Sequence, residues 1–120
     1  MNLLFRLKNF SDKKTVEDYF NNQLPKEDDN CFYNGKRLRQ IKNDEKVYFS
    51  FDGEIVAIGI FTGSIIENEE RDSQYKFGHK LTEIRIIDSN IKLDTKIFGT
   101  NTTYLDTDKK IEEIARILNR

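Results

Sequence analysis

Apolar and polar residues alternate most clearly around Asp52-Gly53, a dipeptide that separates two hydrophobic runs and favours a type I′ turn. The pattern predicts a β-hairpin in which Phe51 lies opposite Glu54. On the face expected to be core, this register gives the pairs Phe49/Val56 and Val47/Ile58. The other face combines hydroxyl-bearing and small residues, so we expect a helix or a ligand to cover it.

Two segments have the spacing of amphipathic helices. The first follows an amino-terminal strand, is capped by Ser11 or Thr15, and ends at Pro25. Its predicted buried stripe is Val16, Tyr19, Phe20 and Leu24. The second begins after Asp106 or Thr107. Its predicted buried stripe is Ile111, Ile114, Ala115 and Leu118.

The segments between the hairpin and the last helix complete the predicted fold. Residues 63–78 are expected to form a long polar connection, residues 81–87 a strand, and residues 91–98 one or two short strands. Hairpins between a first strand and a final helix indicate an α+β fold, namely a small curved antiparallel β-barrel with two flanking helices. A chain of 120 residues is expected to form a single domain, residues 1–120.

Charge is abundant but nearly balanced. The formal charge is −1, so any attraction for nucleic acid must be local rather than a property of the whole chain. One stretch carries four positive charges in seven residues: Lys36, Arg37, Arg39 and Lys42. An acidic run at positions 67–72 compensates for it, and either run is also consistent with an ordinary solvated loop.

The sequence lacks the motifs of catalysis and of metal or cofactor binding. The single cysteine, Cys31, and the single histidine, His79, exclude an internal disulfide and a Cys/His zinc cluster. Neither the glycine pattern of dinucleotide-binding folds nor that of P-loops occurs. We therefore expect a non-enzymatic protein without a cofactor. No apolar run is long enough to span a bilayer, which predicts no membrane partner and a cytoplasmic location.

The basic stretch is the most promising candidate for binding. Its cations can neutralise phosphates, while Phe32, Tyr33 and Tyr75 can stack on a base, an interaction worth about 1–3 kcal/mol per base. The alternative is that Phe32 fills the barrel and the cations are simply exposed.

The run from Phe32 to Gly59 resembles the PUA-like superfamily, and most closely its EVE-type branch. Asn43-Asp44 stands where that branch has Gly-Asp, and Ile58-Gly59-Ile60 resembles its return strand. The resemblance implies a small β-barrel that binds RNA or DNA, in several members by accepting a flipped modified base into an aromatic-walled pocket.

Carried over by position, the resemblance implies roles for several residues of this chain. Phe32 or Tyr33 would take the place of a tryptophan in the pocket wall. The residues expected at phosphate are Lys36, Arg37 and Arg39, and those expected at a base edge are Ser50 or Asp52.

A second motif, Gly78-His79-Lys80-Leu81-Thr82-Glu83-Ile84-Arg85, matches the G-x-K-x-x-E-x-R signature of the ASCH-type branch of the same superfamily. It follows the Gly-Asp strand here, whereas in that branch it precedes it. This resemblance implies RNA binding or a small amidohydrolase that uses Lys80, Thr82 and Glu83.

The leading hypothesis is therefore non-enzymatic binding of a nucleotide or a modified base within nucleic acid. The predicted site is Phe32, Tyr33, Lys36, Arg37, Arg39, Ser50, Asp52 and Tyr75. The alternative is a protein-interaction module, such as an immunity or antitoxin-like partner, in which the acidic run at 67–72 contacts a basic protein. The amidohydrolase is a third possibility.

Overall fold

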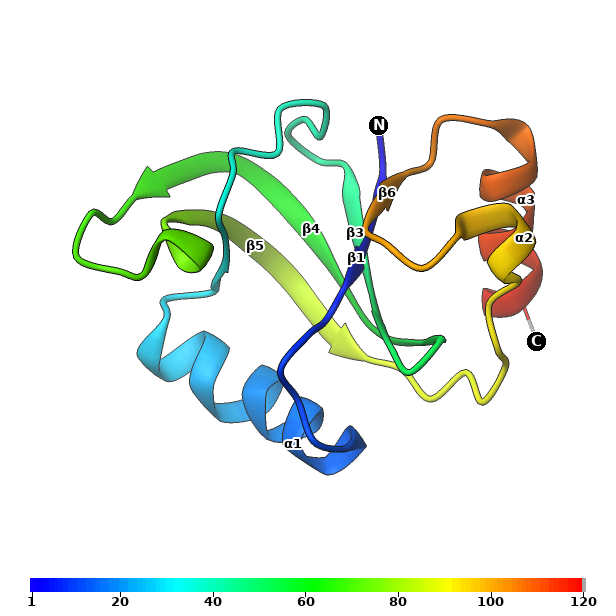
Figure 1. The fold of residues 1–120 in the computed structure, drawn as a ribbon, viewed down its shortest axis with the longest axis horizontal. Coiled ribbons are helices and arrows are strands. Elements are labelled where there is room, and N and C mark those ends of the chain that lie inside the picture. Colours follow the sequence, from blue (N-terminus) through cyan, green and yellow to red (C-terminus); the bar gives the residue numbers. More distant parts are fainter. Residues whose placement is uncertain (120) are drawn as a thin grey trace.

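The computed structural model describes residues 1–119 and consists of one curled, six-stranded sheet with helices on either side (Figure 1). The strands are β1 (Leu3–Arg6), β2 (Cys31–Asn34), β3 (Lys46–Phe51), β4 (Glu54–Glu67), β5 (Phe77–Ile86) and β6 (Thr103–Tyr104). The α-helices are α1 (Lys13–Asp18), α2 (Thr95–Phe98) and α3 (Asp108–Leu118); η1 (Tyr19–Glu27) is a π-helix and η2 (Ser73–Tyr75) a 3₁₀ turn. The predicted α+β class and curved sheet are confirmed.

The sheet is mixed rather than purely antiparallel. Its strand order is β2-β5-β4-β3-β1-β6, and β1 pairs in parallel with β3. A parallel pair needs a long crossover, and the segment that contains α1, η1 and β2 supplies it. Strands β2 and β6 are the two edges, so the sheet is a curled half-barrel and the predicted closed antiparallel barrel is wrong.

The β3–β4 hairpin turns at the predicted dipeptide, where Asp52 and Gly53 have φ angles of 51° and 77°, as a type I′ turn requires. Phe51 lies opposite Glu54, as expected. Beyond Ser50 the register shifts by one residue, so that the observed pairs are Phe49/Ala57, Tyr48/Ile58 and Val47/Gly59. The predicted pairs Phe49/Val56 and Val47/Ile58 are therefore wrong, because a β-bulge inserts one residue and bends β4.

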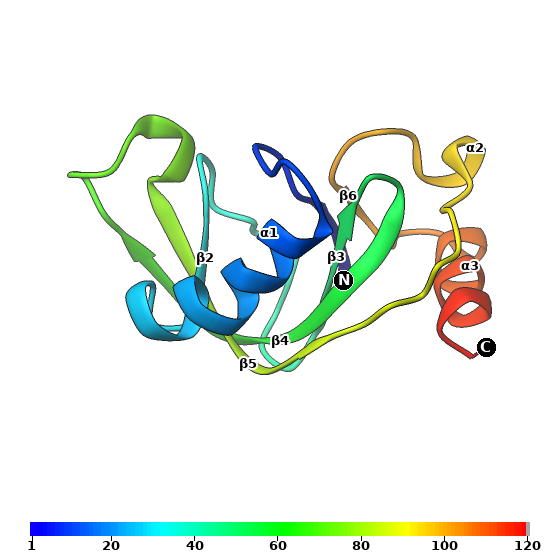
Figure 2. The ribbon, with the colours of Figure 1, turned by 90° about the horizontal axis from the view of Figure 1, so that it is seen from below.

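Both faces of the sheet are buried, each under its own hydrophobic cluster. Side chains that alternate along β3 separate the two: Val47 and Phe49 belong to one cluster, and Tyr48 belongs to the other. The first cluster is covered by the α1–η1 segment and the second by α2 and α3. Figures 1 and 2 show α1 and α3 on either side of strands β1 and β3.

The first helical segment differs from its prediction at both ends. Asp12 caps it, because its carboxylate accepts the Thr15 N–H at 2.8 Å. Pro25 does not end it, since the Asp28 N–H donates to the Gln23 carbonyl at 3.0 Å and carries the π-helical pattern past the proline. The predicted stripe is buried at Val16, Phe20 and Leu24, whereas Tyr19 is only partly buried.

Two loop and strand predictions in the second half of the chain are also wrong. The predicted connection at 63–78 is shorter than expected, because residues 63–67 belong to β4 and residues 77–78 to β5, which pair as an antiparallel ribbon. Only residues 68–76, which include η2, connect the two strands. Residues 95–98 are helical, and the Asp94 carboxylate caps them by accepting the Lys96 N–H.

The final helix begins where expected, with Thr107 as its N-cap. Its buried face differs from the predicted stripe: Glu113, Ile114 and Ile117 are buried, whereas Ile111 is 51% exposed. Within residues 1–119, no helix has both the length and the apolar character needed to cross a membrane.

Candidate functional site

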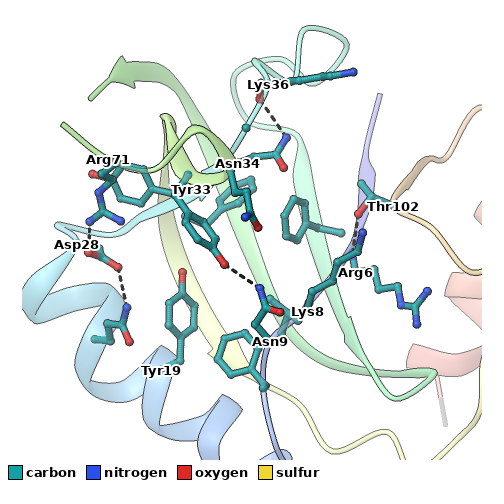
Figure 3. A pocket seen from close by; sticks show the side chains of 18 residues that line it. Arg6, Lys8, Asn9, Tyr19, Asp28, Tyr33, Asn34, Lys36, Arg71 and Thr102 are labelled. Atoms are coloured by element: carbon teal, nitrogen blue, oxygen red, sulfur yellow. Dashed lines mark hydrogen bonds and ion pairs between the residues drawn. The ribbon is translucent and has the colours of Figure 1, made fainter. Parts of the chain in front are cut away.

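A pocket of about 610 Å³ lies between strand β2 and the segment that follows β1, with η1 and the turn before β5 completing its walls (Figure 3). The two sheet segments approach each other because the sheet curls, and the rings of Phe5 and Phe32 meet at 5.0 Å between centroids. The aromatic lining is Phe5, Phe10, Tyr19, Phe32, Tyr33 and Tyr75. The charged lining is Arg6, Lys8, Asp28, Lys36 and Arg71, which makes the pocket positively charged overall.

Phe32 forms part of the pocket floor and belongs to the core. Only 2% of it is exposed, and its ring contacts Phe5 and Phe49 edge-on and stacks on His79 at 5.0 Å. These contacts hold the ring in place but leave it no free face. Phe32 therefore fills the interior of the half-barrel, as the alternative interpretation of the sequence expected, and does not offer an exposed stacking surface.

Tyr33 lies at one end of the pocket, packed between two other groups. Its ring covers Gly78 on the neighbouring strand, where an added Cβ would lie 2.8 Å from Cε1. The Arg71 guanidinium lies over the ring, 3.5 Å from its centroid, and forms an ion pair with Asp28 at 2.7 Å. Burial raises the pKa of Tyr33, while the charge of Arg71 opposes that shift.

Asp28 is 7% exposed, and both of its carboxylate oxygens have partners. Arg71 donates to Oδ1, and the Gln23 side-chain amide donates to Oδ2 at 3.4 Å (Figure 3). Tyr19 and Gln23 both lie on η1 and line this end of the pocket, and the Tyr19 hydroxyl points into it. Burial, with the negative charge of Asp28, raises the pKa of Tyr19 well above its usual range.

Tyr75 reaches across the mouth of the pocket. Its hydroxyl accepts a hydrogen bond from the Asn9 side-chain amide at 2.8 Å, and 38% of the residue remains exposed. Asn9 has a φ of 67°, a left-handed conformation that asparagine tolerates better than most residues. This contact ties the turn before β5 to the segment after β1.

Four of the eight predicted site residues line the pocket: Phe32, Tyr33, Lys36 and Tyr75. The loop after β2 leads away from the pocket toward the opposite edge of the sheet, where the Gln40 N–H donates to the Tyr104 hydroxyl at 3.3 Å.

The other four predicted residues lie outside the pocket, each in a different setting. The Arg37 guanidinium lies over Phe77, 5.1 Å from the ring centroid, and Arg39 is exposed on the loop. Ser50 is buried within the sheet, and Asp52 is exposed at the hairpin tip. The predicted set is therefore not a single site.

The pocket also contains residues that the sequence analysis did not select, namely Lys8, Tyr19, Asp28 and Arg71. Arg71 had one available signal, since it is the only basic residue in the acidic run at 67–72. A single cation within an acidic run can mark a specific ion pair. In the structure the partner of Arg71 is Asp28.

The segment that matches the ASCH signature forms β5, and its polar side chains do not converge. His79 is fully buried, its Nε2 accepts the Leu38 N–H at 3.1 Å, and burial lowers its pKa to about 4. Lys80 pairs with Asp29 at 3.3 Å. Thr82 and Glu83 line a smaller cavity of about 430 Å³, whose lining does not include Lys80.

Comparison with protein-family models finds no match, and comparisons with curated proteins and with solved structures find none either. The PUA-like resemblance accordingly stays a prediction. The chemistry of the pocket itself is the basis for the functional argument below.

Proposed function

We propose that this protein binds a nucleotide, or a modified base within a nucleic-acid strand, in the pocket between β2 and the end of β1. The observation that carries this proposal is the combination of aromatic rings and cations in one cavity. Tyr33 and Tyr75 supply rings, and Lys8, Lys36 and Arg71 supply positive charge.

The size and chemistry of the pocket suit such a ligand. Its volume of about 610 Å³ is within the range of about 300–1,000 Å³ that is common for small-molecule sites. Stacking on an aromatic side chain contributes about 1–3 kcal/mol per base, and lysine ammonium groups complement phosphate oxygens. Because the formal charge of the chain is −1, this attraction is local and not a property of the whole chain.

The proposal includes membership of the PUA-like superfamily, with the EVE-type branch as the nearest comparison. The curled six-stranded sheet with helices on both faces is consistent with that assignment. The proposed ligand-binding residues are Tyr33, Lys36 and Tyr75 from the sequence prediction, with Lys8, Tyr19 and Arg71 from the pocket.

The test is calorimetric titration of the full chain with mononucleotides and with short single-stranded oligonucleotides. Tyr75→Ala removes an exposed ring and should weaken binding by about 1–3 kcal/mol, which is roughly 5-fold to 150-fold. Replacing Lys8 and Lys36 together by Ala should weaken binding and reduce its salt dependence. The matched control replaces Arg37 and Arg39, which lie outside the pocket, and should change affinity little. Equal losses in both double variants would contradict the pocket as the site.

The protein-interaction alternative is supported by one observation. Glu69 and Glu70 are exposed, and neither takes part in an ion pair among residues 1–119. Charge reversal at these two positions should abolish capture of a basic protein partner if that alternative is right, and should leave nucleotide titrations unchanged if the pocket is the functional site.

A further inference from the structure

We propose that the preferred ligand is a purine whose ring carries a positive charge, such as one alkylated at a ring nitrogen, and that this ring binds at the Tyr33–Asp28 end of the pocket. The inference rests on the proposed function and specifies its ligand class. Its starting point is the position of Arg71, whose guanidinium occupies that end of the pocket.

The Arg71 guanidinium is a flat cation, and its surroundings have the features that a flat cation needs. It lies over the electron-rich face of the Tyr33 ring at 3.5 Å and contacts the Asp28 carboxylate at 2.7 Å. The Gln23 amide holds the second carboxylate oxygen in place. The same groups would serve a cationic heterocycle, which needs a ring to stack on and an anion beside its charge.

A ligand could stack on only one face of the Tyr33 ring, and Arg71 occupies that face. The ring packs so closely on Gly78 that a Cβ there would lie 2.8 Å from Cε1 and 3.0 Å from Cζ. The Arg71 guanidinium lies 3.5 Å from the ring centroid, and we infer that it covers the face opposite Gly78. A base that stacks on Tyr33 must therefore displace the Arg71 guanidinium.

This displacement discriminates between charged and neutral bases. Asp28 is 7% exposed, and a buried carboxylate that loses its cationic partner is strongly destabilised. A neutral base would remove Arg71 and leave Asp28 unpaired, whereas a cationic base replaces one positive charge by another. The released Arg71 side chain then becomes available to the phosphate of the same ligand, since it is part of the pocket wall.

The first experiment is calorimetric titration of the full wild-type chain with two pairs of mononucleotides, near neutral pH. 7-Methylguanosine monophosphate and 1-methyladenosine monophosphate carry a ring charge, whereas guanosine and adenosine monophosphates do not. N6-methyladenosine monophosphate controls for the added methyl group, because it is methylated but neutral. We expect each cationic nucleotide to bind at least about tenfold more tightly than its neutral parent, and the neutral methylated control to bind like adenosine monophosphate.

The second experiment asks whether Asp28 is the source of the preference. In Asp28→Asn, the ratio of affinities for the cationic and neutral nucleotides should fall to within about threefold. The matched control is Asp29→Asn, which removes the adjacent carboxylate, 84% exposed and paired with Lys80 instead of Arg71. The control should keep the full ratio. The wild-type comparison stands by itself if Asp28→Asn fails to fold.

The outcomes separate the two proposals. Equal affinity for cationic and neutral nucleotides would overturn the charged-ring inference and leave nucleotide binding intact. A preference for the neutral methylated base over its parent would also overturn it, because the methyl group and not the charge would then be recognised. If none of the nucleotides binds, both the proposed function and this inference fail.

Discussion

His79 lies in the core on β5, directly across from Phe32 of the pocket floor, and acid should destabilise the protein through this residue. It is fully buried, and its ring stacks on Phe32. Its Nε2 accepts the Leu38 N–H, which places the proton of the neutral ring on Nδ1. No partner within residues 1–119 accepts that proton at hydrogen-bond distance. The backbone of Phe32 and Phe77 favours the charged form of the ring, but burial outweighs it and lowers the pKa overall.

The magnitude follows from the difference between the folded and unfolded pKa. Burial lowers the pKa of His79 from 6.5 to about 4, so the unfolded chain binds a proton that the folded protein excludes. At pH values above 6.5, the pKa of His79 in the unfolded chain, the free energy of unfolding does not depend on this residue. It falls as the pH drops from 6.5 toward 4. The loss is about 3 kcal/mol over the whole window and about 2 kcal/mol between about pH 7 and about pH 5.

Urea unfolding at those two pH values, followed by circular dichroism, measures this loss directly. His79 is the only histidine in the chain, so few other groups titrate in the window. His79→Gln is the control, because its amide oxygen can accept the Leu38 N–H but does not titrate. We expect the variant to lose much less stability than the wild type between the two pH values. Equal losses in the two proteins would refute the assignment to His79.

Four other substitutions test the packing and one buried charge. Gly78→Ala places a Cβ 2.8 Å from the Tyr33 ring, so urea unfolding should show a loss of about 1–3 kcal/mol, and nucleotide titration a weaker affinity. Glu54 is buried, which alone would raise its pKa, but hydrogen bonds from two lysines lower it overall. Glu54→Gln should therefore destabilise the protein at neutral pH, and the difference should shrink as the wild-type carboxylate is protonated in acid. Ile114→Ala should cost about 2–5 kcal/mol and Ile111→Ala less than about 1 kcal/mol, and similar losses at both positions would contradict the observed helix face.

The sequence predicts the elements that depend on local chemistry. Asp52-Gly53 specifies its turn because both residues must adopt positive φ angles. The side chains of Asp106 and Thr107 predict the start of the last helix to within one residue, and Thr107 is the cap. The register beyond Ser50 is not predictable in the same way. Both faces of β4 are buried where it pairs with β3, so the alternation of apolar and polar residues that would reveal a one-residue slip is absent there.

The sequence likewise predicts only part of the pocket. Tyr33, Lys36 and Tyr75 were selected because rings and cations are typical of nucleotide sites. Tyr19 is predicted to be core because its helical spacing matches that of Phe20 and Leu24. In the fold it packs at the margin of the core, is only partly buried, and lines the pocket. The pairing of Asp28 with Arg71 depends on residues 43 positions apart, which only the folded sheet brings together.

The contact across the pocket mouth has a kinetic consequence. The Asn9 and Tyr75 side chains join segments 66 positions apart through a neutral hydrogen bond, which is worth only about 1 kcal/mol net. Such a bond breaks and reforms with side-chain rotation on a scale of nanoseconds, without movement of the backbone. Entry should therefore be rapid for every ligand tried, and good and poor ligands should differ mainly in how long they stay.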